Sequence, residues 1–207
     1  MRKLDLELYV ITARVPRLGR DHLDVARAAI EGGASILQLR DKDLSTRELI
    51  ATVEELLQLT RPADIPLLIN DRVDVALAAG AQGVHLGEDD MPIETARRLL
   101  GDQAIIGASA ASVAEARAAQ AAGADYLGVG AMFSSPSKAD AGEPIGPEAI
   151  REINAAVGLP IVGIGGISLE NAAQVIAAGA AGIAVISAVA EAENMVIACR
   201  ALLAIAG

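Results

Sequence analysis

Aromatic residues are almost absent from this chain of 207 residues, which has no Trp, two Tyr and one Phe. The three are Tyr9, Tyr126 and Phe133. The hydrophobic core must therefore be built from Ala, Val, Ile and Leu, which suit close packing of helices on a sheet. A surface that stacks the bases of single-stranded nucleic acid needs exposed aromatic side chains. The composition argues against such a surface.

Basic residues are also in deficit. Seventeen Lys and Arg against 27 Asp and Glu give a formal net charge of −10. A field of this sign attracts neither DNA nor an anionic membrane. A phosphate-bearing substrate would therefore need a local basic patch or a metal ion.

Cysteine and long apolar runs are scarce as well. The one cysteine, Cys199, lies in an Ala-rich segment without a CxxC partner, so we expect a small buried side chain. The first residues show no signal peptide, and no apolar run is long enough to span a bilayer. We therefore expect a cytoplasmic protein with no membrane or nucleic-acid partner. A homo-oligomer is compatible with the sequence.

A short repeat organises the chain. Gly-Gly-Ala or Ala-Gly-Ala closes a helical pattern at residues 32–34, 79–81, 122–124 and 178–180, and an apolar run follows each time. Glycine is a common helix stop, and each interval has room for one further strand and helix. Each of the four repeat units has room for two strand–helix pairs, so the repeat predicts eight strands. The expected strands are Leu8–Thr12, Ile36–Leu39, Leu67–Ile69, Val84–Leu86, Ala104–Ile106, Tyr126–Val129, Ile161–Ile164 and Ile183–Ile186.

Helix starts fit between these strands. Ser45 to Glu48 and Ser112 to Glu115 read as capping boxes, and Asp90 before Pro92 reads as an N-cap. Uniformly apolar strands that alternate with helices predict a parallel sheet covered by helices. We therefore predict α/β architecture, a single-domain (β/α)8 TIM barrel over residues 1–207. An open doubly wound sheet is the alternative, but its G-x-G-x-x-G fingerprint after the first strand is missing.

Three polar clusters stand where apolar runs end, at residues 38–42, 70–72 and 85–90. Carboxyl ends of neighbouring parallel strands meet at one mouth, which is where such folds place their chemistry. In the first cluster Gln38 and Arg40 share one face of a strand, so we expect both to point into the barrel. Arg40 suits phosphate, and Lys42 adds a point charge. The alternative is an ion pair from Arg40 to Asp41 or Asp71.

The other two clusters supply carboxylates. Asp71 and Asp90 follow adjacent strands and could share a cation, since two carboxylates plus phosphate oxygens commonly hold Mg²⁺. The alternative is that each caps the helix that follows it. We interpret His85 as a packed or oriented neutral histidine rather than a metal ligand or base. His22 is expected on the surface of an early helix.

Two further loops complete the predicted mouth. Gly163 to Ser168 ends a strand and is expected to start a helix, and Val185 to Ser187 ends the last strand, so together they predict a second anion site. Two anion sites and a metal suggest two phosphorylated substrates. The segment 131–146 lacks periodicity and carries Phe133 and Lys138, which favours a lid over a surface insertion.

The chain resembles the thiamine phosphate synthase family nearly from end to end. The matching motifs are Leu8-Tyr9-Val10-Ile11-Thr12, Gln38-Leu39-Arg40-Asp41-Lys42, Ile69-Asn70-Asp71-Arg72-Val73-Asp74, Gly83-Val84-His85-Leu86-Gly87, Gly107-Ala108-Ser109, Gly128-Val129-Gly130, Ser135-Pro136-Ser137-Lys138 and Ile164-Gly165-Gly166-Ile167. Ala13, Ala108, Ser135 and Ser137 depart from the family, which often carries Asp, Val, Thr and Thr there.

The resemblance implies a transferase that joins hydroxymethylpyrimidine diphosphate to thiazole phosphate, or its carboxylated form, with Mg²⁺ as cofactor. It assigns catalytic roles to Arg40, Lys42, Ser109 and Lys138, and metal binding to Asp71 and Asp90. Substrate contacts are implied for Gln38, Arg40, Lys42, Asn70, Ser109, Ser135, Ser137, Lys138, Gly165, Gly166, Ile186 and Ser187.

Two rival readings remain. A related family shares the barrel but tautomerises a carboxythiazole phosphate with a histidine after the sixth strand, where this chain has Gly130-Ala131-Met132. A thiazole- or thiamine-phosphate-binding regulator would tolerate loss of the diphosphate residues. This chain retains Gln38, Arg40, Lys42 and Lys138, so both rivals are minor.

Overall fold

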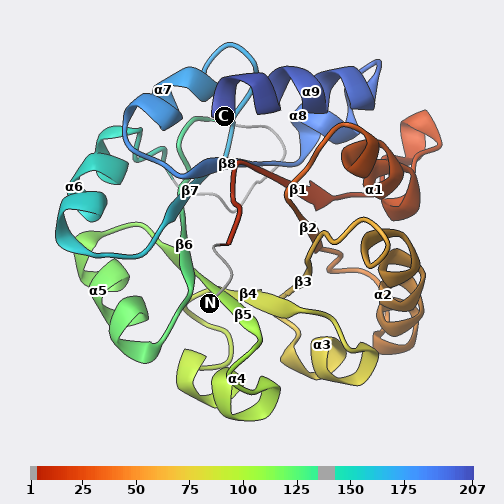
Figure 1. The fold of residues 1–207 in the computed structure, drawn as a ribbon, viewed down its shortest axis with the longest axis horizontal. Coiled ribbons are helices and arrows are strands. Elements are labelled where there is room, and N and C mark those ends of the chain that lie inside the picture. Colours follow the sequence, from red (N-terminus) through yellow and green to blue (C-terminus); the bar gives the residue numbers. More distant parts are fainter. Residues whose placement is uncertain (1–3, 135–142) are drawn as a thin grey trace.

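The computed structural model describes residues 4–134 and 143–207, and it confirms the predicted barrel (Figure 1). Eight parallel strands close in sequence order, and β1 pairs with β8 to complete the ring. The strands are β1 Leu8–Thr12, β2 Ile36–Leu39, β3 Leu67–Asn70, β4 Gly83–Leu86, β5 Ile105–Ala110, β6 Tyr126–Val129, β7 Ile161–Ile164 and β8 Gly182–Val185.

Helices form an outer layer around the strands (Figure 1). A short 3-10 helix, η1, covers Pro16–Leu18. The α-helices are α1 His22–Glu31, α2 Thr46–Thr60, α3 Val73–Ala79, α4 Ile93–Leu100, α5 Val113–Ala122, α6 Glu148–Ala156, α7 Ala172–Ala177, α8 Ser187–Ala190 and α9 Met195–Ala206. Within the described ranges, no helix is long and apolar enough to cross a membrane.

Local signals account for several of the helix starts. Ser45 and Glu48 form the predicted capping box of α2, and Ser112 accepts a hydrogen bond from the Glu115 backbone at the start of α5. The predicted cap of α4 is wrong. No side chain caps that helix, and the Asp90 carboxylate accepts instead from the Gly87 backbone N–H at 2.7 Å. Asp90 is thereby held at the mouth of the barrel.

Alternation along each strand divides the core into two layers. Leu37 and Leu39 belong to the larger cluster between the strands and the helices. The smaller cluster fills the barrel interior and includes Tyr9, Leu68 and Tyr126. Gln38 is 2% exposed and hydrogen-bonds to Tyr9 inside the barrel, so its predicted inward orientation is confirmed.

Glycines on the interior face make room for the larger rings. A Cβ at Gly107 would lie 2.1 Å from Cζ of Tyr126, and one at Gly128 would lie 2.8 Å from Cε1 of His85. Both distances are too short for a real side chain. The glycines therefore let two polar rings pack inside an otherwise aliphatic barrel.

The amino end of the barrel is filled by apolar side chains. Leu6, just before β1, is buried and joins the interior cluster together with Leu4. The carboxyl ends of the strands carry the polar clusters instead. Cys199 is fully buried in α9, as predicted, and burial raises the pKa of its thiol to about 12.

Candidate active site

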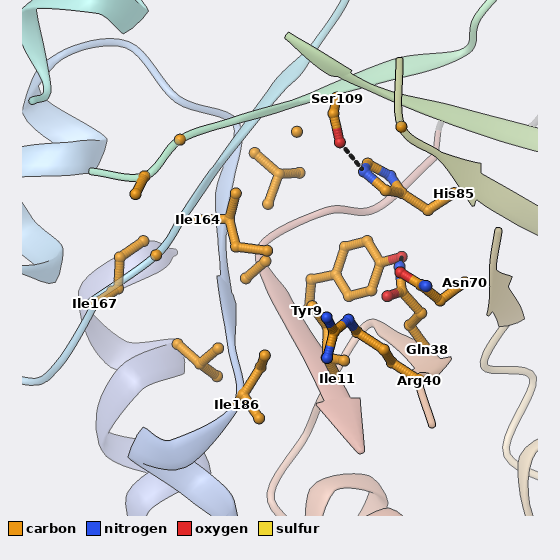
Figure 2. A pocket seen from close by; sticks show the side chains of 18 of the residues that line it. Tyr9, Ile11, Gln38, Arg40, Asn70, His85, Ser109, Ile164, Ile167 and Ile186 are labelled. Atoms are coloured by element: carbon orange, nitrogen blue, oxygen red, sulfur yellow. Dashed lines mark hydrogen bonds between the residues drawn. The ribbon is translucent and has the colours of Figure 1, made fainter. Parts of the chain in front are cut away.

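A cavity of about 340 Å³ opens at the carboxyl ends of the strands (Figure 2). Every predicted site residue in the described ranges lines it. These are Gln38, Arg40, Lys42, Asn70, Asp71, Asp90, Ser109, Gly165, Gly166, Ile186 and Ser187. Ser135, Ser137 and Lys138 lie outside the described residues. Volumes of this order are typical of small-molecule sites.

The two carboxylates of the cavity lie close enough to influence each other. Burial, and after it the neighbouring Asp90 carboxyl, raise the pKa of Asp71 to about 6, against the opposing effects of the Asn70 hydrogen bond and the charge of Lys42. Asn70 donates to Asp71 Oδ2 at 2.6 Å. Asp71 has a positive φ of 62°, and no side chain caps α3. The alternative role of Asp71 as a helix cap is therefore wrong.

This carboxylate pair fits a divalent cation. The pair concentrates negative charge that a cation would neutralise, and Mg²⁺ is typically held by one or two carboxylates together with substrate phosphates and water. Within the described ranges, no group of three His, Cys, Asp or Glu side chains is arranged to hold a metal. Asp71 and Asp90 thus suit a site that ligand oxygens complete.

The basic side of the cavity consists of Arg40 and Lys42. The alternative in which Arg40 pairs with Asp41 is wrong, because Asp41 turns away from the cavity and accepts from Arg14 and His22. Among the described residues, Arg40 forms no ion pair with Asp71 either. Its guanidinium is therefore available to an anionic ligand.

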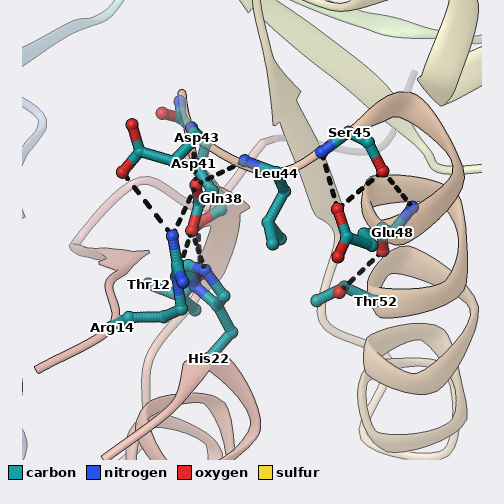
Figure 3. A network of polar contacts seen from close by, with 10 residues as sticks. All are labelled: Thr12, Arg14, His22, Gln38, Asp41, Asp43, Leu44, Ser45, Glu48 and Thr52. Atoms are coloured by element: carbon teal, nitrogen blue, oxygen red, sulfur yellow. Dashed lines mark hydrogen bonds and ion pairs between the residues drawn. The ribbon is translucent and has the colours of Figure 1, made fainter. Parts of the chain in front are cut away.

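Asp41 ties the loop after β2 to the start of α1 (Figure 3). Its side chain is 5% exposed and accepts from Arg14 Nε at 2.6 Å and from the backbone of Asp43 and Leu44. Burial alone would raise the pKa of Asp41, but these hydrogen bonds and that of His22 hold it well below its usual range. The loop that carries Lys42 is thus anchored from outside the cavity.

The expectation that His22 lies on the surface is wrong. His22 is 3% exposed, with Nδ1 2.9 Å from Thr12 Oγ1 and Nε2 3.0 Å from Asp41 Oδ2 (Figure 3). The first helical turn of α1 faces the loop after β2. Its partner Asp41 is 19 residues away in the sequence, so local pattern could not reveal the contact.

A chain of hydrogen bonds crosses the floor of the cavity, and sequence reasoning did not find it. Gln38 Nε2 lies 2.7 Å from Tyr9 Oη, which lies 2.9 Å from Tyr126 Oη. His85 Nδ1 is 2.9 Å from Tyr126 Oη, and His85 Nε2 is 3.1 Å from Ser109 Oγ (Figure 2). The predicted oriented role of His85 is thereby confirmed. The missed signal was two tyrosines inside apolar strands, whose buried hydroxyls need partners.

The glycine loop after β7 serves packing as well as the cavity. Gly165 and Gly166 have φ of 96° and 66°, and a Cβ at Gly166 would lie 2.5 Å from the Phe133 carbonyl oxygen. Phe133 N–H in turn donates to the Gly165 carbonyl. The expectation that this loop leads directly into a helix is wrong, because α7 begins only at Ala172. The glycines let the segment after β6 close over the cavity wall.

The chain is similar to known proteins over nearly its whole length. A family described as thiamine monophosphate synthase matches residues 8–189. This chain belongs to that family. The thiamine-phosphate synthase of Roseiflexus sp. strain RS-1 is 53% identical over 198 residues, covering 96% of this chain and 84% of that protein. The thiamine-phosphate synthase of Moorella thermoacetica is 50% identical over 196 residues, covering 95% and 93%.

A solved member of the thiamine monophosphate synthase family shares the fold closely. Thiamine phosphate pyrophosphorylase from Pyrococcus furiosus superposes with a TM-score of 0.89 at 46% identity, covering 98% of this chain and 96% of that one. The resemblance drawn from the motifs is therefore confirmed over nearly the whole barrel.

Proposed function

We propose that this chain joins 4-amino-2-methyl-5-hydroxymethylpyrimidine diphosphate to thiazole phosphate, giving thiamine phosphate and diphosphate. The observation that carries the proposal is the arrangement of one cavity. On one side, Arg40 and Lys42 follow β2, and the carboxylates Asp71 and Asp90 follow β3 and β4. The glycine loop after β7 and the residues after β8 line the other side of the same cavity.

The reaction needs a leaving group to be neutralised more than it needs a base. The C–O bond between the pyrimidine CH₂ and diphosphate breaks, and the electron pair leaves with diphosphate. The ring amino group donates electrons toward the CH₂ carbon, and the thiazole nitrogen then supplies the lone pair of the new C–N bond. Arg40 and Lys42 would bind the departing diphosphate, where preorganised charge is most effective.

Magnesium completes this neutralisation in the proposal. Asp71 and Asp90 would hold Mg²⁺, and the ion would supply positive charge to the diphosphate oxygens. Asn70 would contact the same substrate and keeps Asp71 oriented through its 2.6 Å hydrogen bond. Gln38 and Ser109 would face the pyrimidine side of the cavity.

The second substrate would bind on the other side. Gly165, Gly166, Ile186 and Ser187 line the cavity there, and we assign them to the phosphate of the thiazole. Phe133 lies over this wall and would help to exclude water. The assignments of Ser135 and Ser137 to this phosphate, and of Lys138 to the diphosphate, remain predictions from the resemblance.

Arg40→Ala tests the division into two anion sites. A hydrogen bond to a charged group contributes about 1.5–3 kcal/mol, so affinity for the pyrimidine diphosphate should fall about ten- to a hundredfold. Affinity for thiazole phosphate should stay nearly unchanged, as measured by calorimetry for each ligand alone. Arg47→Ala is the matched control, since Arg47 is exposed on α2 and does not line the cavity. Equal weakening of both ligands by Arg40→Ala would refute the two-site assignment.

A further inference from the structure

The hydrogen-bond chain on the cavity floor joins five side chains from five strands: Gln38 of β2, Tyr9 of β1, Tyr126 of β6, His85 of β4 and Ser109 of β5. Gln38, Tyr9 and Tyr126 are buried and His85 is half-buried, while Ser109 is exposed in the cavity. Each hydroxyl has one hydrogen to donate. The direction of every bond therefore depends on its neighbours.

The first bond sets the direction. The Gln38 amide nitrogen is a donor only, so the Tyr9 oxygen accepts at 2.7 Å. Among the described residues, the structure gives the Tyr9 hydroxyl one other partner, Tyr126 Oη at 2.9 Å. Tyr9 is 2% exposed, and a buried hydroxyl hydrogen without an acceptor is costly. Tyr9 must therefore donate to Tyr126.

The same reasoning carries the direction to His85. The Tyr126 oxygen already accepts from Tyr9, and its side chain is fully buried. Its hydrogen is satisfied only if His85 Nδ1 accepts it, at 2.9 Å. A protonated Nδ1, in either the other tautomer or the imidazolium, would leave that hydrogen without an acceptor.

We infer that this hydrogen-bond chain holds His85 as the neutral Nε2–H tautomer and thereby presents Ser109 to the ligand as a hydrogen-bond donor. His85 Nε2–H donates to Ser109 Oγ at 3.1 Å, so the hydroxyl hydrogen of Ser109 is left for the cavity. The opposite direction would use that hydrogen on His85. Tyr9, Tyr126 and His85 are thus positioning residues.

The consequence for recognition rests on the proposed function. A donor at Ser109 selects an acceptor on the ligand, and both a pyrimidine ring nitrogen and a diphosphate oxygen are acceptors. Binding of inorganic diphosphate and of the phosphate-free hydroxymethylpyrimidine to Ser109→Ala separates the two. Loss of affinity for only one of them identifies the acceptor. Unchanged affinity for both would overturn the donor role.

The tautomer can be measured directly in the ligand-free protein. The chain has two histidines, so ¹⁵N spectra of protein labelled at His are assigned by the signals that His85→Asn removes. We expect the wild-type His85 to carry its proton on Nε2. Gln38→Glu places an acceptor beside Tyr9, which reverses each bond in turn and should move most of the His85 population to the Nδ1–H form.

Two further variants separate transmission through the chain from a simple field effect. Tyr126→Phe removes the link, so Gln38→Glu should no longer move the His85 proton in that background. Asn70→Asp makes the same amide-to-carboxylate change on β3. Asn70 is in register with His85 but is not a member of the hydrogen-bond chain. This variant should leave the proton on Nε2. A wild-type proton on Nδ1, or a Gln38→Glu effect that persists in Tyr126→Phe, would overturn the inference.

Activity gives a second readout. Gln38→Glu loses both its substrate contact and the donor at Ser109, whereas the double variant with Tyr126→Phe frees Ser109 again. The double variant should therefore exceed Gln38→Glu in kcat/KM by about two- to tenfold, the effect of one ordinary hydrogen bond. A double variant no faster than Gln38→Glu would contradict the hydrogen-bond chain. Absence of thiamine phosphate with the wild type would refute the proposed function and leave the tautomer result standing.

Discussion

Asp41 gives the sharpest test of how the loop after β2 is held. Asp41→Asn keeps the size of the side chain but removes the charge that His22 Nε2 contacts at 3.0 Å and Arg14 Nε at 2.6 Å. The Arg14 side chain is 40% exposed, so that ion pair is screened and adds little. The buried contacts decide the magnitude. At about 1.5–3 kcal/mol for a hydrogen bond to a charged group, we expect a loss of about 2–3 kcal/mol in the free energy of unfolding.

The pH dependence of this loss has a definite sign. The pKa of Asp41 is held well below its usual range in the folded protein, so the folded state binds the proton less tightly than the unfolded chain. The stabilisation is therefore fully present above the ordinary Asp pKa of about 3.9 and declines as the pH falls toward the lower folded-state value. Urea unfolding of wild type and Asp41→Asn at pH 7 and pH 3 should show a smaller difference at pH 3.

Asp43→Asn is the matched control. Asp43 makes the same type of contact to Arg14, at 3.6 Å, but its side chain is 88% exposed. Its replacement should change the free energy of unfolding by less than about 0.5 kcal/mol. Equal losses in the two variants, or a loss in Asp41→Asn that does not shrink at low pH, would refute the anchoring role of Asp41.

Three further outcomes follow from the structure. Asp71→Asn should abolish the dependence of turnover on added Mg²⁺ along with most of the activity, whereas full wild-type activity in excess chelator would exclude the metal site. Thr60→Val should raise the free energy of unfolding by about 1 kcal/mol in urea titrations, because Thr60 Oγ1 is buried and has no hydrogen-bond partner among the described residues. Gly107→Ala should lower it by about 1–3 kcal/mol, since its Cβ would overlap Tyr126. Gly158→Ala, whose Cβ would meet only Gln120 Oε1 at 3.8 Å, should be nearly neutral, and equal costs at the two glycines would contradict the packing account.

The backbone of this protein is readable from the sequence because its signals are local. The four Gly-Gly-Ala or Ala-Gly-Ala repeats and the runs of Val, Ile and Leu locate the eight strands, and β1, β2, β6 and β7 have the expected limits. The inward face of β2 is also readable, because Gln38 and Arg40 alternate with leucines. The convergence of Asp71 and Asp90 was predictable from the adjacency of β3 and β4.

The contacts that failed prediction are those set by tertiary structure. β1 and β6 are apolar on both faces, so alternation cannot tell that Tyr9 and Tyr126 point inward and meet at 2.9 Å. His22 is the first residue of α1, and its side chain would be exposed if the helix stood alone. Only the return of the chain at Asp41 buries it. The sequence could thus predict which residues reach the mouth of the barrel, but not the network that orients them.

The central claim is that this one cavity condenses two phosphorylated substrates. The most direct measurement incubates the purified chain with the pyrimidine diphosphate, thiazole phosphate and Mg²⁺, and follows the products by mass spectrometry. The account predicts thiamine phosphate and diphosphate in equal amounts, with no thiamine phosphate when either substrate is omitted. Binding of both substrates without formation of thiamine phosphate would contradict it.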